Sequence, residues 1–195
     1  MDVLFSIILY FPVLSLLHIS SAGVPFWELQ EFLHTSRRIW IFAASQPQFY
    51  GSYNATCIFY RTRNLTDNSV TLLYQAVWNM TVHKKTVEAQ LLQYPPRMEM
   101  TDWNGNNVTK ELRYWNRYYW CAIFLVRIVV EKNAPTWCEL HVQGPALRGV
   151  FKSGSNFTAC DQKYDKLCPY NTTKVILVTK ECPNKPHKEE IERKE

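Results

Sequence analysis

The segments YYWCAIFLVRIVV (118–130) and TWCELHV (136–142) decide the fold class. Both are rich in β-branched and aromatic residues, which favour β-strands. A turn signal, Asn133-Ala134-Pro135, separates them. Because two consecutive strands with a short connection pair antiparallel, these segments predict an antiparallel β-sheet.

The same texture extends back to residue 38, in six further runs separated by turn signals. These runs are RIWIFAAS (38–45), TCIFYRTR (56–63), VTLLYQAVWNMTV (70–82), VEAQLLQY (87–94), MEMTDW (98–103) and VTKELRYW (108–115). The dipeptide Asn104-Gly105 between the last two is typical of a hairpin. Eight strands closed on themselves have no exposed edges and leave room for one small ligand, so we predict an all-β, eight-stranded antiparallel up-and-down barrel. A β-sandwich with the same strand count is the alternative architecture.

Other elements flank the predicted barrel. Pro25 precedes FWELQEFLHTS, in which Phe26, Leu29 and Leu33 follow helical spacing, so a short N-terminal helix is expected. We expect a second helix within 156–170 and a last strand at 173–180. The barrel domain is predicted to span 23–182. The charged segment 183–195 lacks apolar periodicity and is interpreted as a disordered tail.

Residues 1–22 are interpreted as a secretory signal peptide. Residues 3–19 are apolar, Pro12 interrupts them, and Ser20-Ser21-Ala22 supplies the small residues that signal peptidase requires. No Lys or Arg precedes the apolar run, so an uncleaved anchor is the alternative. No second apolar run reaches membrane-spanning length, so no membrane span is expected in the mature chain.

Cleavage after Ala22 would leave 173 residues and would remove Asp2, so that 22 basic side chains face 16 acidic ones. The basic residues are scattered along the sequence, for example at Arg37-Arg38 and Lys84-Lys85. This mild excess favours solubility and weak attraction to acidic surfaces. Nucleic acid is not expected as a partner, because a secreted protein seldom meets it.

Secretion changes how the six cysteines are interpreted. An oxidising compartment allows up to three disulfides, drawn from fifteen pairings among Cys57, Cys121, Cys138, Cys160, Cys168 and Cys182. Zinc, the alternative, favours closely spaced ligands, whereas seven residues separate the nearest pair, so no metal is expected. Six N-x-T sequons point to the same compartment and predict surface glycosylation at Asn54, Asn64, Asn79, Asn107, Asn156 and Asn171.

From Cys121 onward the chain resembles tick salivary lipocalins, the superfamily of the histamine-binding proteins. The matching segments are Cys121-Ala122-Ile123, Cys138-Glu139-Leu140-His141, Cys160 with Tyr164 and Cys168, and VILVTKEC ending at Cys182. Cys57 also has a counterpart in that family. The resemblance implies the disulfides Cys57–Cys182, Cys121–Cys160 and Cys138–Cys168.

The departures from the family pattern bear on the ligand. Amine-binding members show Cys-Asp-aliphatic and then Glu-Leu-Trp/Tyr, whereas this chain has Ala122 in place of the Asp and His141 in place of the aromatic residue. A buried ammonium needs compensating carboxylates, so the loss of one should weaken amine binding severely. Glu139 remains, with His141 on the same strand face as a possible partner. Alternatively, both side chains point to the barrel mouth and are solvated.

The remaining expected lining is aromatic and aliphatic. If Asn79 carries a glycan, Tyr74, Trp78 and Met80 point inward; by family register, Trp120, Ala122 and Phe124 do so as well. Together with Glu139 and His141, these are the predicted ligand-binding residues. Such a wall suits a sterol, such as cholesterol, or a fatty-acid-like ligand. The alternative is a small barrel filled by its own side chains.

Within the family, the missing amine motif, the many sequons and the mild basicity resemble the japanin group, which binds cholesterol and reprogrammes host dendritic cells. The resemblance implies a secreted, extracellular immunomodulator with a possible receptor on host immune cells. The alternative is a scavenger that sequesters histamine, serotonin or a leukotriene.

An enzyme is not expected. The sequence shows no nucleophile elbow, metal-ligand cluster or paired-carboxylate pattern, and no catalytic residue or cofactor is predicted. If all cysteines pair, no thiol nucleophile remains.

Overall fold

The computed structural model describes residues 23–129, 136–153, 158–168 and 173–182. The predicted signal peptide, the predicted charged tail and the turn at 133–135 lie outside the described residues.

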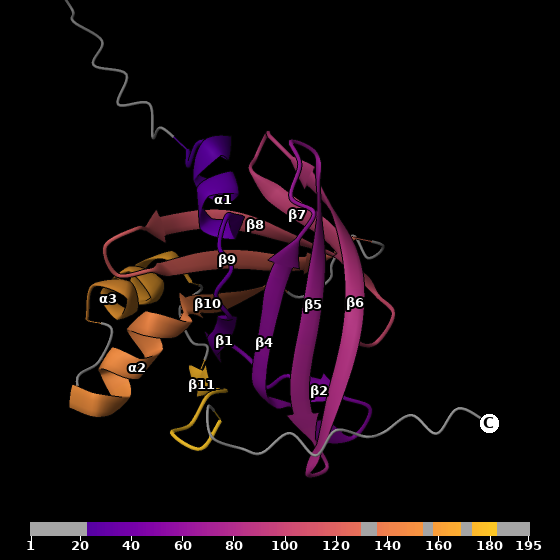
Figure 1. Cartoon of the computed structure of the whole chain (residues 1–195), viewed down its shortest axis with the longest axis vertical. Coiled ribbons are helices and arrows are strands. Elements are labelled where there is room, and N and C mark those ends of the chain that lie inside the picture. The colour runs from indigo at the N-terminus through magenta and orange to yellow at the C-terminus, as the bar shows by residue number, and fades with distance from the viewer. Residues whose placement is uncertain (1–22, 130–135, 154–157, 169–172, 183–195) are drawn as a thin grey trace, which may run out of the picture.

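Eight antiparallel strands form a closed barrel (Figure 1). Each strand pairs with the next along the chain, and β1 also pairs with β10, which closes the sheet. The prediction of a barrel is therefore confirmed over that of a sandwich. The strands are β1 (Ile39–Ala44), β4 (Thr56–Arg63), β5 (Ser69–Trp78), β6 (Thr81–Leu92), β7 (Arg97–Thr101), β8 (Asn107–Asn116), β9 (Cys121–Ile128) and β10 (Trp137–Gln143).

Alternation along the strands decides which side chains enter the barrel, because successive residues point to opposite faces. In β6, for example, Val87, Ala89 and Leu91 are buried, whereas Glu88 and Gln90 between them are exposed. The inward residues of all eight strands form one apolar cluster. A second cluster, on the outer face of β9 and β10, is covered by helices.

The hairpin between β5 and β6 differs from the prediction. The sequence favoured one run over 70–82, but Asn79 and Met80 both have positive φ, of 48° and 60°. Two consecutive residues of this kind form a tight two-residue turn whose twist matches that of the flanking strands. β5 therefore ends at Trp78, and β6 begins at Thr81 rather than near residue 87.

Three shorter strands complete the β-structure. β2 (Phe49–Tyr50) and β3 (Tyr53–Asn54) form a small separate hairpin that the sequence did not predict. β11 (Val175–Ile176) pairs with β1, so the predicted strand at 173–180 is regular over only two residues.

Three helices surround the barrel. α1 (Phe26–Leu33) is the predicted N-terminal helix and buries Leu29, Phe32 and Leu33 in the barrel interior. α3 (Thr158–Leu167) lies within the predicted range 156–170. α2 (Gly144–Ser153) was not predicted, although Pro145 fits its first turn. Both α2 and α3 pack against the outside of the barrel (Figure 1).

The three disulfides join these parts, and they are the same pairs that the family resemblance implies. Cys121–Cys160 and Cys138–Cys168 fasten α3 and the residue after it to β9 and β10. Cys57–Cys182 fastens the end of the described chain to β4. All six cysteines are thereby paired.

Candidate ligand-binding site

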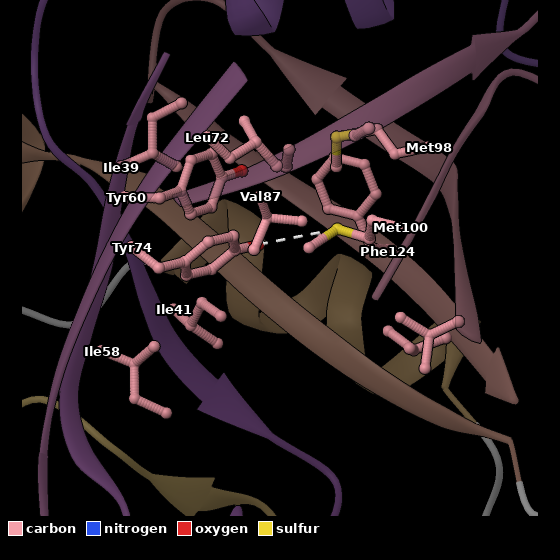
Figure 2. Packing of buried hydrophobic residues seen from close by; sticks show 14 of the residues in the cluster. Ile39, Ile41, Ile58, Tyr60, Leu72, Tyr74, Val87, Met98, Met100 and Phe124 are labelled. Carbon is pink, nitrogen blue, oxygen red and sulfur yellow. Dashed lines mark hydrogen bonds between the residues drawn. The ribbon is translucent and has the colours of Figure 1, made fainter. Parts of the chain in front are cut away.

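The barrel interior is packed solid in the half that faces α1. Phe32 of α1 contacts Phe124 and Trp115, with ring centroids 5.5 Å and 5.1 Å apart. The backbone carbonyl of Phe32 also accepts a hydrogen bond from the buried side chain of Gln143. Residues such as Phe124, Met98 and Leu72 fill the space between the walls (Figure 2). The helix α1 thus closes this end of the barrel with its own side chains.

A buried polar network crosses the barrel below this packed layer. Glu139 of β10 accepts hydrogen bonds from Lys110 Nζ at 2.6 Å, from His141 Nε2 at 2.8 Å and from Trp137 Nε1 at 3.2 Å. His141 Nδ1 lies 2.9 Å from the hydroxyl of Tyr60 on β4. Lys110 and Glu139 are only 6% and 2% exposed, so water does not screen their interaction.

Glu139 and Lys110 form an ionised pair. The nearby ammonium and the hydrogen bonds outweigh the effect of burial and lower the pKa of Glu139 to about 2. Burial lowers the pKa of Lys110, but the charge of Glu139 more than reverses this, so that it is raised above its usual value. The pair therefore contributes no net charge to the barrel interior.

The protonation of His141 follows from its two neighbours. Burial lowers the pKa of His141, so the ring is neutral. An ionised carboxylate only accepts, so the ring proton lies on Nε2 and is donated to Glu139. Nδ1 then accepts from the Tyr60 hydroxyl, which keeps its proton because burial raises its pKa well above 10. Every polar atom of this chain of contacts has a partner.

A cavity lies in the other half of the barrel, with this polar network as its floor. The volume of the cavity is about 60 Å³. Its walls are mostly apolar, and the polar groups that reach it include Lys110, Glu139, Lys85 and Asp102. Tyr74 crosses its inner end, where its hydroxyl lies 3.8 Å from Met100 Sδ (Figure 2).

Aromatic rings surround the mouth of this cavity. The ring of Trp78 stacks on His83 with centroids 3.6 Å apart. The ring centroids of Tyr50 and Trp103 lie 4.2 Å and 5.0 Å from that of Trp78. The β2–β3 hairpin, which carries Tyr50, is tied to the loop after β7, because Asn104 Nδ2 donates to the carbonyl of Phe49 at 3.1 Å. The mouth is thus partly covered by a hairpin that is held by this hydrogen bond and by the contact of Tyr50 with Trp78.

Three of the predicted ligand-binding residues, Tyr74, Trp78 and Glu139, line the cavity. His141 contacts Glu139 in the polar network, as the sequence suggested. Both side chains are buried, so the alternative, in which both are solvated at the barrel mouth, is wrong. Ala122 and Phe124 point inward but belong to the packed half, where Phe124 lies 4.6 Å from His141 by ring centroids. Ala122 and Phe124 are therefore not among the residues that line the cavity, contrary to the prediction.

Two predicted residues lie elsewhere. Met80 is fully exposed, because the two-residue turn removes it from the strand alternation on which its prediction rested. Trp120 has a φ of 50° in the turn before β9, and its ring lies under the guanidinium of Arg37 at 4.9 Å. It does not line the cavity. Both predictions extended a strand through a turn.

Sequence reasoning missed Lys110, the residue that neutralises Glu139. Its position carried a signal, since Lys110 stands between Val108 and Leu112 at the strand spacing of two and therefore shares their inward face. Trp103 and Trp137 were also missed as lining residues.

Four of the predicted glycosylation sites, Asn54, Asn64, Asn79 and Asn107, are exposed, while Asn156 and Asn171 lie outside the described residues. Within the described residues, no group of three or more potential metal ligands comes together. Nor does any helix in these ranges combine the length and apolar character needed to cross a bilayer.

Comparison with known proteins identifies the fold. No protein-family model and no curated protein matches the sequence. The structure aligns with the crystal structure of AM182 in complex with serotonin, with a TM-score of 0.55 and 14% identity, over 77% of this chain and 88% of that chain. The siderocalin Ex-FABP, described as having dual ligand specificities, aligns with a TM-score of 0.45 and 10% identity, over 74% and 89% of the two chains. With its closed eight-stranded barrel, its N-terminal helix and its C-terminal helix packed outside, the chain has the lipocalin fold.

Proposed function

We propose that this protein binds a small, uncharged and mainly apolar ligand in the barrel cavity and acts as a carrier rather than an enzyme. The observation that carries this proposal is the ion pair between Lys110 and Glu139 at the cavity floor. A binding site that already contains a matched positive and negative charge offers no surplus charge to an ionic ligand.

Cationic amines are disfavoured for this reason. Taking an ammonium out of water is costly unless a carboxylate compensates. Among the described residues, Glu139 is the carboxylate buried inside the barrel, and it already forms an ion pair with Lys110 at 2.6 Å. Asp102, at the mouth, accepts hydrogen bonds from the backbone of Asn104 and Asn106 and is engaged within its own loop. Serotonin, the ligand of the AM182 complex, would have to displace Lys110.

The chemistry of the walls favours a flat or elongated apolar body. Rings of Trp78, Trp103 and Tyr50 surround the mouth and offer faces for stacking. At the floor, Lys110 donates to Glu139 at 2.6 Å, and an ammonium has three N–H groups. Another of these N–H groups can donate to a hydroxyl or carbonyl oxygen at the inner end of the ligand.

A sterol such as cholesterol has this chemistry, and we propose this ligand class, with a fatty-acid-like molecule as the variant. The cavity volume of about 60 Å³ is smaller than a sterol requires. Binding would therefore move the aromatic side chains at the mouth and the β2–β3 hairpin apart. The hairpin meets this part of the barrel through the hydrogen bond between Asn104 and Phe49 and through the ring contact between Tyr50 and Trp78, and an opening would break both.

We further propose that the protein is secreted and modulates host immune cells, as the resemblance to the japanin group implies. Three disulfides and four exposed sequons support an oxidising, extracellular setting. Sequestration of a host mediator is the alternative, and it would use the same cavity without a receptor.

Isothermal titration calorimetry of the delipidated protein tests the proposal, with cholesterol, a leukotriene, serotonin and histamine as separate titrants. We expect saturable binding of an apolar titrant and no heat from either amine. Trp103→Ala, in the cavity wall, should weaken binding about tenfold through lost ring contact, whereas Trp27→Ala, an exposed residue of α1, should leave it unchanged. Tight binding of an amine, or equal effects of the two variants, would contradict the proposal.

A further inference from the structure

A groove on the outer wall of the barrel collects four arginines. Arg37, Arg38, Arg61 and Arg148 line it, together with Ser36, Trp40, Gly144, Pro145 and Leu147, and its volume is about 490 Å³. No acidic residue is among these lining residues. The basic residues that look scattered in the sequence are thus gathered by the fold.

The strand register explains this gathering. β1 pairs antiparallel with β4, and Ile39 lies opposite Tyr60. Arg38 precedes Ile39 and Arg61 follows Tyr60, so the same register places the two arginines opposite each other. On the other edge of β1, Ile39 lies opposite Gln143, and Gly144 donates its backbone N–H to the carbonyl of Arg38 at 2.9 Å. The start of α2, which carries Arg148, is therefore held beside the same position.

Aromatic rings position two of the four guanidinium groups. Arg38 lies over Phe59 at 4.7 Å, and Arg37 lies over Trp120 at 4.9 Å. Stacking on a ring face leaves the N–H groups at the edge of the guanidinium free to donate.

The positive charges of the groove are not neutralised from within the protein. Among the residues that the structure describes, none of the four arginines forms an ion pair. Burial lowers the pKa of Arg38, and the nearby positive charge of Arg61 lowers it further.

A second groove continues this surface. It shares Ser36 and Arg61 with the first, adds Arg63 and His34, and has a volume of about 600 Å³. Neither groove has an acidic lining residue, so together they form an elongated basic track along β4 and the start of β1. A track of this shape fits an extended chain that carries repeated negative charges better than it fits a single ion.

We infer that this track binds a linear sulfated polysaccharide. The planar guanidinium group donates two parallel hydrogen bonds to a sulfate group, and four such groups line the groove. Nucleic acid is a poorer match, because Trp40 is only 3% exposed and offers no face on which a base can stack. A bilayer is also a poorer match, since no exposed large apolar side chain lines either groove to insert among lipids. This surface is distinct from the barrel cavity.

Titration of the full secreted chain with a heparin-derived oligosaccharide at about 0.15 M salt tests the inference. The same oligosaccharide after chemical desulfation, single-stranded DNA and vesicles containing phosphatidylserine serve as further probes. We expect binding of the sulfated oligosaccharide and a loss of at least about tenfold on desulfation, because the sulfates are the acceptors.

Two double variants with the same charge change separate a site from general attraction. Arg61→Ser with Arg148→Ser removes two exposed groove arginines that no ring holds, and should weaken binding at least about tenfold. Lys84→Ser with Lys166→Ser removes two exposed lysines outside both grooves and should change it less than about twofold. Equal losses in the two double variants, no binding by the wild type, or tighter binding to DNA or vesicles would overturn the inference. Binding of an apolar ligand in the cavity should be unaffected by either double variant.

Discussion

Lys110 Nζ lies 2.6 Å from Glu139 Oε2 inside the barrel, on two strands separated by β9. Both side chains are almost completely buried, and His141 shares the same carboxylate oxygen. This contact sets the charge of the cavity floor to zero and ties β8 to β10 through the interior. It therefore bears on both the stability of the barrel and the class of ligand that enters it.

Replacing Lys110 with Met should destabilise the protein by about 3–5 kcal/mol, because Glu139 would remain buried without its counterion. Chemical denaturation at neutral pH measures this change. The double variant Lys110→Met with Glu139→Leu removes both charges and should be more stable than the single variant. Lys84→Met, on the exposed face of β6, serves as the matched control and should change stability by less than about 0.5 kcal/mol. A double variant as unstable as the sum of its parts would contradict this account.

Stability should fall as the pH drops below about 6.5, in two stages. The pKa of His141 is lowered by burial, so the unfolded chain takes up a proton first, and stability is lost below the unfolded pKa of 6.5. The pKa of Glu139 is lowered to about 2, so its contribution is present above 4.5 and is lost as the pH falls from 4.5 through about 2. Each group contributes a slope of at most about 1.4 kcal/mol per pH unit.

Urea denaturation at a series of pH values checks this dependence. His141→Gln should abolish the slope between pH 6.5 and 5, whereas His34→Gln, at an exposed position after α1, should retain it. An unchanged slope in the His141 variant would assign the acid sensitivity to other groups.

Much of the barrel could be predicted because strand alternation is a local property. Each of the eight predicted runs overlaps an observed strand, since inward apolar residues recur at every second position. The predicted strand boundaries were wrong where the backbone conformation, rather than the side-chain pattern, ended a strand. Asn79 and Met80 adopt positive φ in a turn that the run VTLLYQAVWNMTV conceals, and α2 begins at a Gly-Pro pair that resembles a loop.

The candidate site was less predictable because its contacts join distant strands. Glu139 and His141 are two residues apart, so their contact could be expected from sequence. Lys110 is 29 residues from Glu139, and Tyr60 is 81 residues from His141. The pairing of β9 with both β8 and β10 brings Lys110 to Glu139, and the closure of the barrel through β1 brings Tyr60 to His141. The arginine groove has the same origin, because it needs the pairing of β1 with both β4 and β10.

Removing the Cys57–Cys182 disulfide by Ser substitution at both positions should destabilise the protein more than removing Cys138–Cys168. The first bond closes a segment with a sequence separation of 125 residues and the second one of 30. Chain entropy alone gives losses of about 5 and about 3.6 kcal/mol, respectively. Denaturation of the two double variants under non-reducing conditions measures the difference. The reverse order would show that native contacts around Cys138, rather than loop length, decide the loss.

Replacing Lys110 with Ala should give the barrel an affinity for amines that the wild type lacks. The variant leaves Glu139 without its counterion next to the space that the lysine side chain had filled, and a protonated amine such as serotonin can supply the missing positive charge. The gain is measured as saturable heat on titration and as a rise in melting temperature with ligand, because a ligand that binds only the folded state stabilises it. Lys110→Ala combined with Glu139→Gln keeps the space but removes the charge, and it should not bind the amine. If that double variant binds serotonin equally well, cavity volume rather than charge governs ligand choice, and the neutral floor would not explain the preference for an apolar ligand.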